Sequence, residues 1–260
     1  MKRPNPITKT LAIGFLVSVA VAAFLPFLDI VIPVVGWHLV VSNFTIYQFT
    51  LAIAWGIAML GLNLLTGYNG QFSVGHSAFF AVGAFSAAIF IEHFGWGPYE
   101  SILVAAAFSF TFGFLFGLPA LRLEGLYLAL ATFGLAVATP QLLKFDAFAE
   151  WTGVQGIFVP KPEPLIAGLS PDQSLYYVAL AIMVFLMVIT WCILHSRSGR
   201  AMMAIRDNPI AARTMGINMP LVKTTTFGIS AMFAGIGGAL FTYASEFVSP
   251  DAFNFFVAVY

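Results

Sequence analysis

Charged residues are scarce in this sequence: only 8% of its 260 positions are Asp, Glu, Lys or Arg, against about 25% in soluble domains. Eleven basic and eleven acidic residues cannot cover the surface of a soluble globule of this length. Hydrophobic residues make up 60% of the chain, and 28 residues are Phe. The outside of the protein is therefore expected to face lipid, as in a polytopic membrane protein.

Other absences exclude classes of function. A single cysteine, Cys192, excludes an internal disulfide framework and a cysteine-built metal site. The net charge of zero argues against nucleic-acid binding, which needs a basic stripe. The sequence has neither a G-x-x-x-x-G-K-[ST] loop for ATP nor an H-E-x-x-H zinc motif. We therefore predict that the chain is not an enzyme and binds no metal or cofactor.

Apolar windows predict an all-α membrane protein, in which residues 1–260 form one transmembrane domain. A helix needs about 20 apolar residues to cross a bilayer. An eighth window begins near Ala252 and stops after nine residues, too few to span, which favours a C-terminally truncated fragment. Seven windows are long enough: Leu11–Leu28, Phe44–Leu65, Phe72–Ile91, Ile102–Leu121, Gly125–Leu143, Leu175–Leu194 and Thr224–Tyr243.

Basic residues predict the orientation of these helices, because short cytoplasmic loops are enriched in Lys and Arg. Six crossings separate the two basic segments, so both are expected on the cytoplasmic side. The loops around Glu92, Asp146 and Glu246 are acidic or mixed and are expected outside. The basic residues are Lys2, Arg3 and Lys9 at the N-terminus, and Arg197, Arg200, Arg206, Arg213 and Lys223 after the sixth window.

The first window also resembles a secretory signal, with basic residues before an apolar run and a possible cleavage site at Ala20–Ala22. The apolar run, however, continues through Leu25. We therefore favour an uncleaved membrane anchor.

Residues 61–80 combine glycines and polar side chains inside a region otherwise suited to hydrocarbon. Polar groups and irregular backbone are tolerated at membrane depth only beside protein or water. One interpretation is a broken helix that lines a translocation path. The alternative is a short cytoplasmic turn at Thr66–Gln71, with His76 as a packing residue. The candidate pathway residues are Asn63, Thr66, Asn69, Gln71, His76 and Ser77, with Tyr127 and Thr132 as weaker candidates.

Two sets of glycines lie within apolar windows. Gly113 and Gly117 have G-x-x-x-G spacing, and Gly235, Gly237 and Gly238 form a second set. Small residues let neighbouring helix backbones approach closely. We predict that both sets serve helix packing rather than ligand binding.

The basic loop 195–223 contains a short predicted helix, Pro209–Met215. Asn208 suits the N-cap, Pro209 the first helical position, and Gly216 the left-handed residue after the end. Ala211 and Ala212 would give this helix a smooth surface.

The apolar residues Ile210 and Met215 are expected to be exposed on this helix. Such a helix can serve as a docking element for a soluble partner. It can equally rest on lipid headgroups, which the arginines would also suit.

The loop also carries a family resemblance. Ala211–Gly216 resembles the A-A-x-x-x-G core of the coupling loop of ABC-importer permeases, although Ile210 stands where many of them have Glu. The longer segment 197–218 resembles LivM-type permeases of branched-chain amino acid importers. Segments 61–80, 125–134, 230–240 and 249–253 agree, so the resemblance covers about three quarters of the chain.

The resemblance implies a multi-pass permease of the bacterial inner membrane. Its expected partners are a second, related permease, two cytoplasmic ABC ATPases that use ATP, and a periplasmic substrate-binding protein. Branched-chain amino acids are the expected substrates, with urea, short amides or other amino acids as alternatives. An ion-driven secondary transporter remains the alternative from another class. The residues expected to couple to the ATPase are Asn208, Pro209, Ile210, Ala211, Ala212, Met215 and Gly216.

Overall fold

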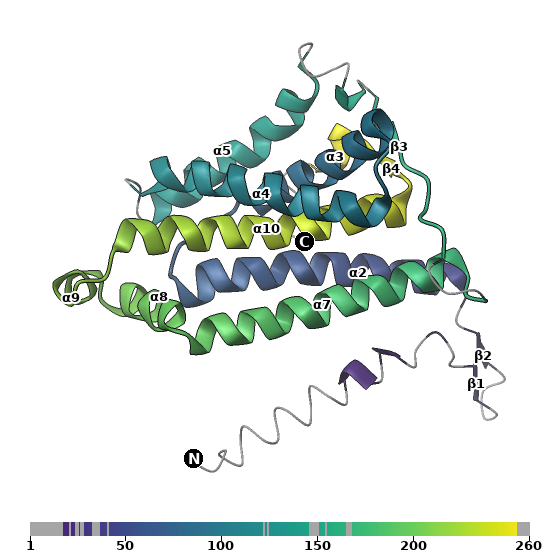
Figure 1. Cartoon of the computed structure of the whole chain (residues 1–260), viewed down its shortest axis with the longest axis horizontal. Coiled ribbons are helices and arrows are strands. Elements are labelled where there is room, and N and C mark those ends of the chain that lie inside the picture. Colours follow the sequence, from purple (N-terminus) through teal and green to yellow (C-terminus); the bar gives the residue numbers. More distant parts are fainter. Residues whose placement is uncertain are drawn as a thin grey trace.

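The structure is a computed structural model, in which α-helices run side by side along the long axis of the molecule (Figure 1). Two short two-stranded antiparallel sheets accompany the helices in the described residues. One pairs β1 (Asp29–Ile32) with β2 (Trp37–Val40), and the other pairs β3 (Ile157–Phe158) with β4 (Phe247–Val248). The structure describes residues 18–20, 22, 23, 26, 29–32, 37–40, 42–121, 123, 125–145, 151–153, 155–164 and 168–253.

Six helices within these described residues are long and apolar enough to cross a membrane. They correspond to six of the predicted windows, and the first window, Leu11–Leu28, lies largely outside the described residues. The predicted eighth segment is described only as far as η3 (Pro250–Phe253), a single 3₁₀ turn. The six are α2 (Asn43–Leu62) with its continuation η2 (Asn63–Tyr68), α3 (His76–Phe94), α4 (Pro98–Ala120), α5 (Leu126–Leu143), α7 (Pro171–His195) and α10 (Met219–Ser245).

The start of the third window was predicted wrongly. The sequence predicts a helix from Phe72, but α3 begins at His76, and residues 69–75 form an irregular connection. Gly70 has a φ of +72° there, a conformation that glycine adopts without strain. A count of apolar residues does not detect such a break, because Phe72 and Val74 are themselves apolar.

Helix α10 forms the centre of the bundle. In Figure 1 it lies between α2 and α7 on one side and α3, α4 and α5 on the other. Its apolar window is 83% buried within the chain, whereas that of the outer helix α7 is 17% buried. The exposed apolar surface of α7 is suited to lipid or to another subunit.

Close backbone contacts surround α10 wherever it carries glycine. A Cβ atom added at Gly83 would lie 2.2 Å from the carbonyl oxygen of Gly235, and one at Gly238 would lie 2.0 Å from that of Phe80. One added at Gly113 would lie 2.2 Å from Cβ of Ala231. The prediction that these glycines serve helix packing is therefore confirmed.

The bundle has two distinct ends. The first, which we call the α9 end, carries α8 (Arg197–Asp207) and α9 (Pro209–Thr214). The opposite end, which we call the β3 end, carries the two-stranded sheet of β3 and β4. The two ends differ in how their loops are held.

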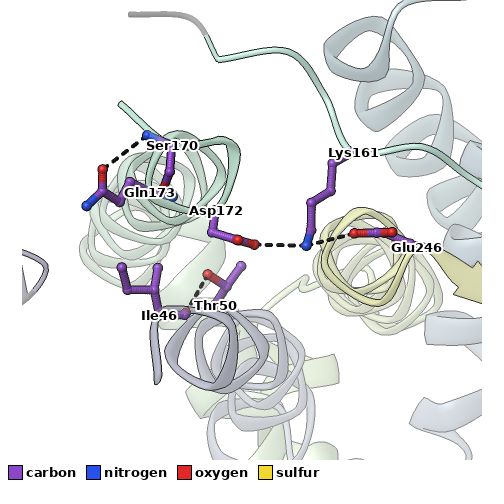
Figure 2. Close-up of polar contacts among 7 residues, drawn as sticks. All are labelled: Ile46, Thr50, Lys161, Ser170, Asp172, Gln173 and Glu246. Atoms are coloured by element: carbon purple, nitrogen blue, oxygen red, sulfur yellow. Dashed lines mark hydrogen bonds and ion pairs between the residues drawn. The ribbon is translucent and has the colours of Figure 1, made fainter. Parts of the chain in front are cut away.

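An ion network joins three segments at the β3 end. Figure 2 shows Lys161 between two carboxylates, with Nζ 2.9 Å from Asp172 and 2.7 Å from Glu246. Asp172 lies in the first turn of α7, which a capping box of Ser170 and Gln173 begins. Glu246 follows α10 directly, so Lys161 ties its loop to the ends of both helices.

The charge of Lys161 makes this network sensitive to pH. Burial lowers the pKa of the Lys161 ammonium, but the hydrogen bonds and charges of Glu246 and Asp172 outweigh that effect and raise the pKa above its usual value. A raised pKa in the folded state gives stability that is present below the unfolded value, about 10.4, and is lost as pH rises through the folded value.

We therefore expect Lys161→Met to lower the melting temperature of the purified protein at pH 8. The gap between wild type and variant should begin to narrow above about pH 10.4 and should close as the pH passes the raised pKa of folded Lys161. Thermal unfolding in detergent at pH 8 and at pH 11 measures both values. A gap of equal size at the two pH values would contradict a stabilising role for the ammonium charge.

Candidate translocation and coupling sites

The polar break in the sequence begins as a π-helical turn. Helix α2 continues without interruption into η2, in which each turn holds one residue more than in an α-helix. Gly67 allows Asn63 to fold back over this turn, since a Cβ atom at Gly67 would lie 2.5 Å from Oδ1 of Asn63. Single π-turns of this kind occur frequently at functional sites.

A cavity of about 710 Å³ opens beside η2 at the α9 end. Asn63 and Thr66 supply side-chain polar groups to its otherwise largely apolar wall, and the Thr66 hydroxyl donates to the carbonyl oxygen of Gln71 at 3.1 Å. A mostly apolar wall with a few polar groups is typical of small-molecule sites. The remaining lining residues are Met59, Leu62, Gly67, Phe72, Ser73, Val74, Gly125, Leu126 and Ala129.

Asn69 and Gln71 lie apart from the lining of this cavity. Both are buried in the connection after η2, where Nδ2 of Asn69 donates to Oε1 of Gln71 at 2.7 Å. The paired amides hold the turn closed. The two residues therefore form a turn, as in the alternative interpretation, but that interpretation expected their side chains to meet water, and both are buried because the amides pair with each other.

His76 and Ser230 link three helices through hydrogen bonds, and we call this link the His76 pin. The Ser230 hydroxyl donates to the carbonyl oxygen of Gly61 at 2.6 Å, so it accepts from Nε2 of His76 at 2.7 Å. Ser73 then donates to Nδ1 at 3.3 Å. Both ring nitrogens are therefore engaged within the chain, joining α2, α3 and α10.

Ser77 is buried next to this pin, and with His76 it lines a cavity of about 40 Å³. That volume holds little more than a water molecule. The geometry therefore favours packing roles for His76 and Ser77.

The two weaker candidates lie on different sides of α5. Tyr127 is 72% exposed, whereas Thr132 is buried and accepts the backbone N–H of Val74 at 3.0 Å. The neighbouring residues Leu126 and Ala129 line the large cavity instead. No pattern in the sequence points to Leu126 and Ala129, because they are apolar residues within an apolar window.

The predicted helix in the basic loop is present as α9. Oδ1 of Asn208 accepts the N–H of Ala211 at 3.0 Å, and Gly216 has a φ of +80°. The helix ends at Thr214, one residue earlier than predicted, with Met215 as its C-cap. Its two ends are thus capped as the sequence predicts.

The side chains of α9 and its C-cap differ widely in exposure. Ile210 and Met215 are 79% and 83% exposed, and Ala211 is exposed beside them. Ala212 is only 3% exposed, so its side chain faces the chain itself. A partner would therefore meet Ile210 and Met215 first. We expect Ala212 to act by seating α9 on its own chain.

Comparison with known proteins identifies the family of the chain. A family model described as "Branched-chain amino acid transport system / permease component" matches residues 44–260. The chain belongs to this permease family. The match begins at α2 and includes every residue of the large cavity and of α9.

Individual relatives in this family cover the chain to different extents. The high-affinity branched-chain amino acid transport system permease protein LivM of Escherichia coli (strain K12) is 32% identical over 246 residues, covering 85% of this chain and 57% of that protein. LivM of Salmonella typhimurium gives the same values. The autoinducer 2 import system permease protein LsrC of Enterobacter sp. (strain 638) is 26% identical over 160 residues, covering 57% of this chain and 43% of that protein.

The chain therefore spans 57% of the length of the LivM relatives that it matches. No solved structure gives a significant match.

Proposed function

We propose that this chain is the transmembrane subunit of an ABC importer for branched-chain amino acids in the bacterial inner membrane. The family match over residues 44–260 carries the proposal. Two separate cytoplasmic ATPases drive the transport cycle. A second, related permease and a periplasmic binding protein complete the importer.

In this proposal the α9 end faces the cytoplasm, and so does the N-terminus. Arg197, Arg200, Arg206, Arg213 and Lys223 gather at the α9 end, in accordance with the positive-inside rule. Seven crossings then account for the seven apolar windows that are long enough to span a bilayer. Ile210 and Met215 face the ATPase from this side.

The cavity beside η2 suits the proposed substrates. Met59, Leu62 and Leu126 offer apolar surface to an aliphatic side chain, while Asn63 and Thr66 offer polar groups. We propose that these residues form the part of the translocation path contributed by this chain.

Uptake into proteoliposomes tests the proposed function. The complete importer, with its ATPases and binding protein, is reconstituted, and labelled leucine is offered outside. ATP in the compartment of the ATPases should drive uptake, and ionophores that dissipate ion gradients should leave it unchanged. Uptake that follows an ion gradient without ATP would identify a secondary transporter. Preferential uptake of urea or short amides would contradict the proposal that branched-chain amino acids are the substrates.

Asn63 and His76 should respond differently to replacement by leucine. Asn63→Leu removes a polar group from the cavity wall, so we expect uptake to fall about tenfold, equivalent to about 1.4 kcal/mol, with little change in melting temperature. His76→Leu removes both hydrogen bonds of the His76 ring. Unlike Asn63→Leu, it should therefore lower the free energy of unfolding, by about 1–3 kcal/mol.

Met59→Leu is the matched control, because it changes the same cavity wall but keeps it apolar. It should retain uptake close to wild type. Full uptake in Asn63→Leu would remove Asn63 from the translocation path.

A further inference from the structure

Arg206 joins the loop of α8 and α9 to the wall of the large cavity. Its Nη1 donates to the carbonyl oxygen of Gly67 at 2.8 Å, across 139 positions of sequence. Gly67 lies near the end of η2, where the last carbonyls of a helix lack donors within the helix. A cation at a helix C-terminus is also favoured by the helix dipole.

The guanidinium is held in place from its other side. Nε and Nη2 of Arg206 lie 3.0 and 2.9 Å from the same carboxylate oxygen of Asp207. The stem of Arg206 packs on Gly70, where an added Cβ atom would lie 2.9 Å from Cγ. Gly70 has a positive φ, so the turn after η2 is shaped to receive this side chain.

The two ends of this contact lie close to the two functional elements. Arg206 is two residues before Asn208, the N-cap of α9. Gly67 lines the cavity of about 710 Å³, between Thr66 and the turn that Gly70 begins. The buried residues Gly199, Met202 and Ile205 seat α8 against the bundle, so α8 connects the two elements as a packed helix.

We infer that Arg206 is a positioning residue that transmits movement of α9 to η2 and so to the cavity. The inference rests on the proposed function, because it requires an ATPase that moves α9. When α9 moves, Arg206 carries the displacement to the Gly67 carbonyl. Loss of this contact leaves the ATPase free to hydrolyse ATP without rearranging the cavity wall.

Reconstituted importer carrying Arg206→Ala provides the test, with leucine uptake and ATP hydrolysis measured on the same vesicles. We expect hydrolysis to stay within about twofold of wild type while uptake falls at least about tenfold. Arg206→Lys, which keeps the charge but not the planar donor geometry, should retain part of the uptake. Arg200→Ala is the matched control, because the side chain of Arg200 on the same helix donates to the nearby carbonyl oxygen of His195, at 3.3 Å, and has no hydrogen bond to η2 among the described residues.

A structural probe supports the kinetic test. A cysteine at Thr66, with Cys192 replaced by serine, is labelled with a maleimide in the presence and absence of ATP. The labelling rate should change with ATP when Arg206 is present and lose most of that change in Arg206→Ala.

The outcomes separate the two levels of the proposal. Absence of ATP-dependent uptake by the wild-type importer would reject the proposed function itself. ATP-dependent uptake by wild type, with uptake and hydrolysis in Arg206→Ala unchanged or lowered by the same factor, would overturn the role of Arg206 alone.

Discussion

Gly83→Ala is expected to destabilise the protein severely. The added methyl group would lie 2.2 Å from the carbonyl oxygen of Gly235 and 2.3 Å from its Cα, both in the central helix α10. Neither backbone atom can move without displacing α3 from α10, so the cost should lie at the upper end of the usual range for overpacking, at about 3 kcal/mol. Thermal unfolding in detergent and the yield of monodisperse protein measure the effect.

Gly134→Ala is the matched control, because Gly134 also lies in a membrane-spanning helix, but no described atom of another part of the chain lies within 4 Å of a Cβ added there. Alanine favours helix over glycine by roughly 0.5–1 kcal/mol, so this variant should be as stable as wild type or more stable. Equal melting temperatures for the two variants would contradict the close approach of α3 and α10.

The double variant Ile210→Asp, Met215→Asp is expected to abolish ATP-driven uptake without unfolding the chain. Both side chains are almost fully exposed, so the folded chain loses few contacts when they change. At a protein interface, loss of an anchor residue costs about 2 kcal/mol or more, and about 1.4 kcal/mol is a factor of ten in affinity. Two buried carboxylates should therefore weaken ATPase binding by at least about 1,000-fold.

Co-purification of the ATPase with the double variant measures this loss, and the melting temperature of the isolated chain serves as the folding control. Ile210→Leu, Met215→Leu keeps the apolar surface and should retain the ATPase. Normal co-purification of the ATPase with the aspartate variant would contradict the hypothesis that the ATPase docks on α9.

The membrane helices and the caps of α9 could be predicted from the sequence because each rests on a local pattern. Apolar windows located all six spans among the described residues, and Asn208, Pro209 and Gly216 located the ends of α9 within one residue. Charge scarcity and apolar run length are properties of the chain itself. They need no knowledge of which helices are neighbours.

The cavity beside η2 and the hydrogen bonds of His76 depend on residues that are distant in sequence but adjacent in the fold. They could therefore not be predicted in detail. His76 and Asn63 looked alike in sequence, as polar residues in apolar surroundings. Only the position of Ser230, 154 residues away, turns His76 into a packing residue. Likewise, the cavity wall includes Leu126 and Ala129, which have no polar signal at all.

Docking of a separate ATPase on α9 is the central claim, and crosslinking from position 210 tests it most directly. Ile210→Cys is introduced with Cys192 replaced by serine, and a short bifunctional reagent is added to membranes that contain the whole importer. Position 210 is preferred to position 212, because Ala212 is buried within the chain. Capture of a P-loop ATPase subunit is expected, with a yield that ATP changes. Labelling of position 210 by lipid-phase reagents alone, with no captured ATPase, would contradict the claim and leave α9 as a membrane-surface helix.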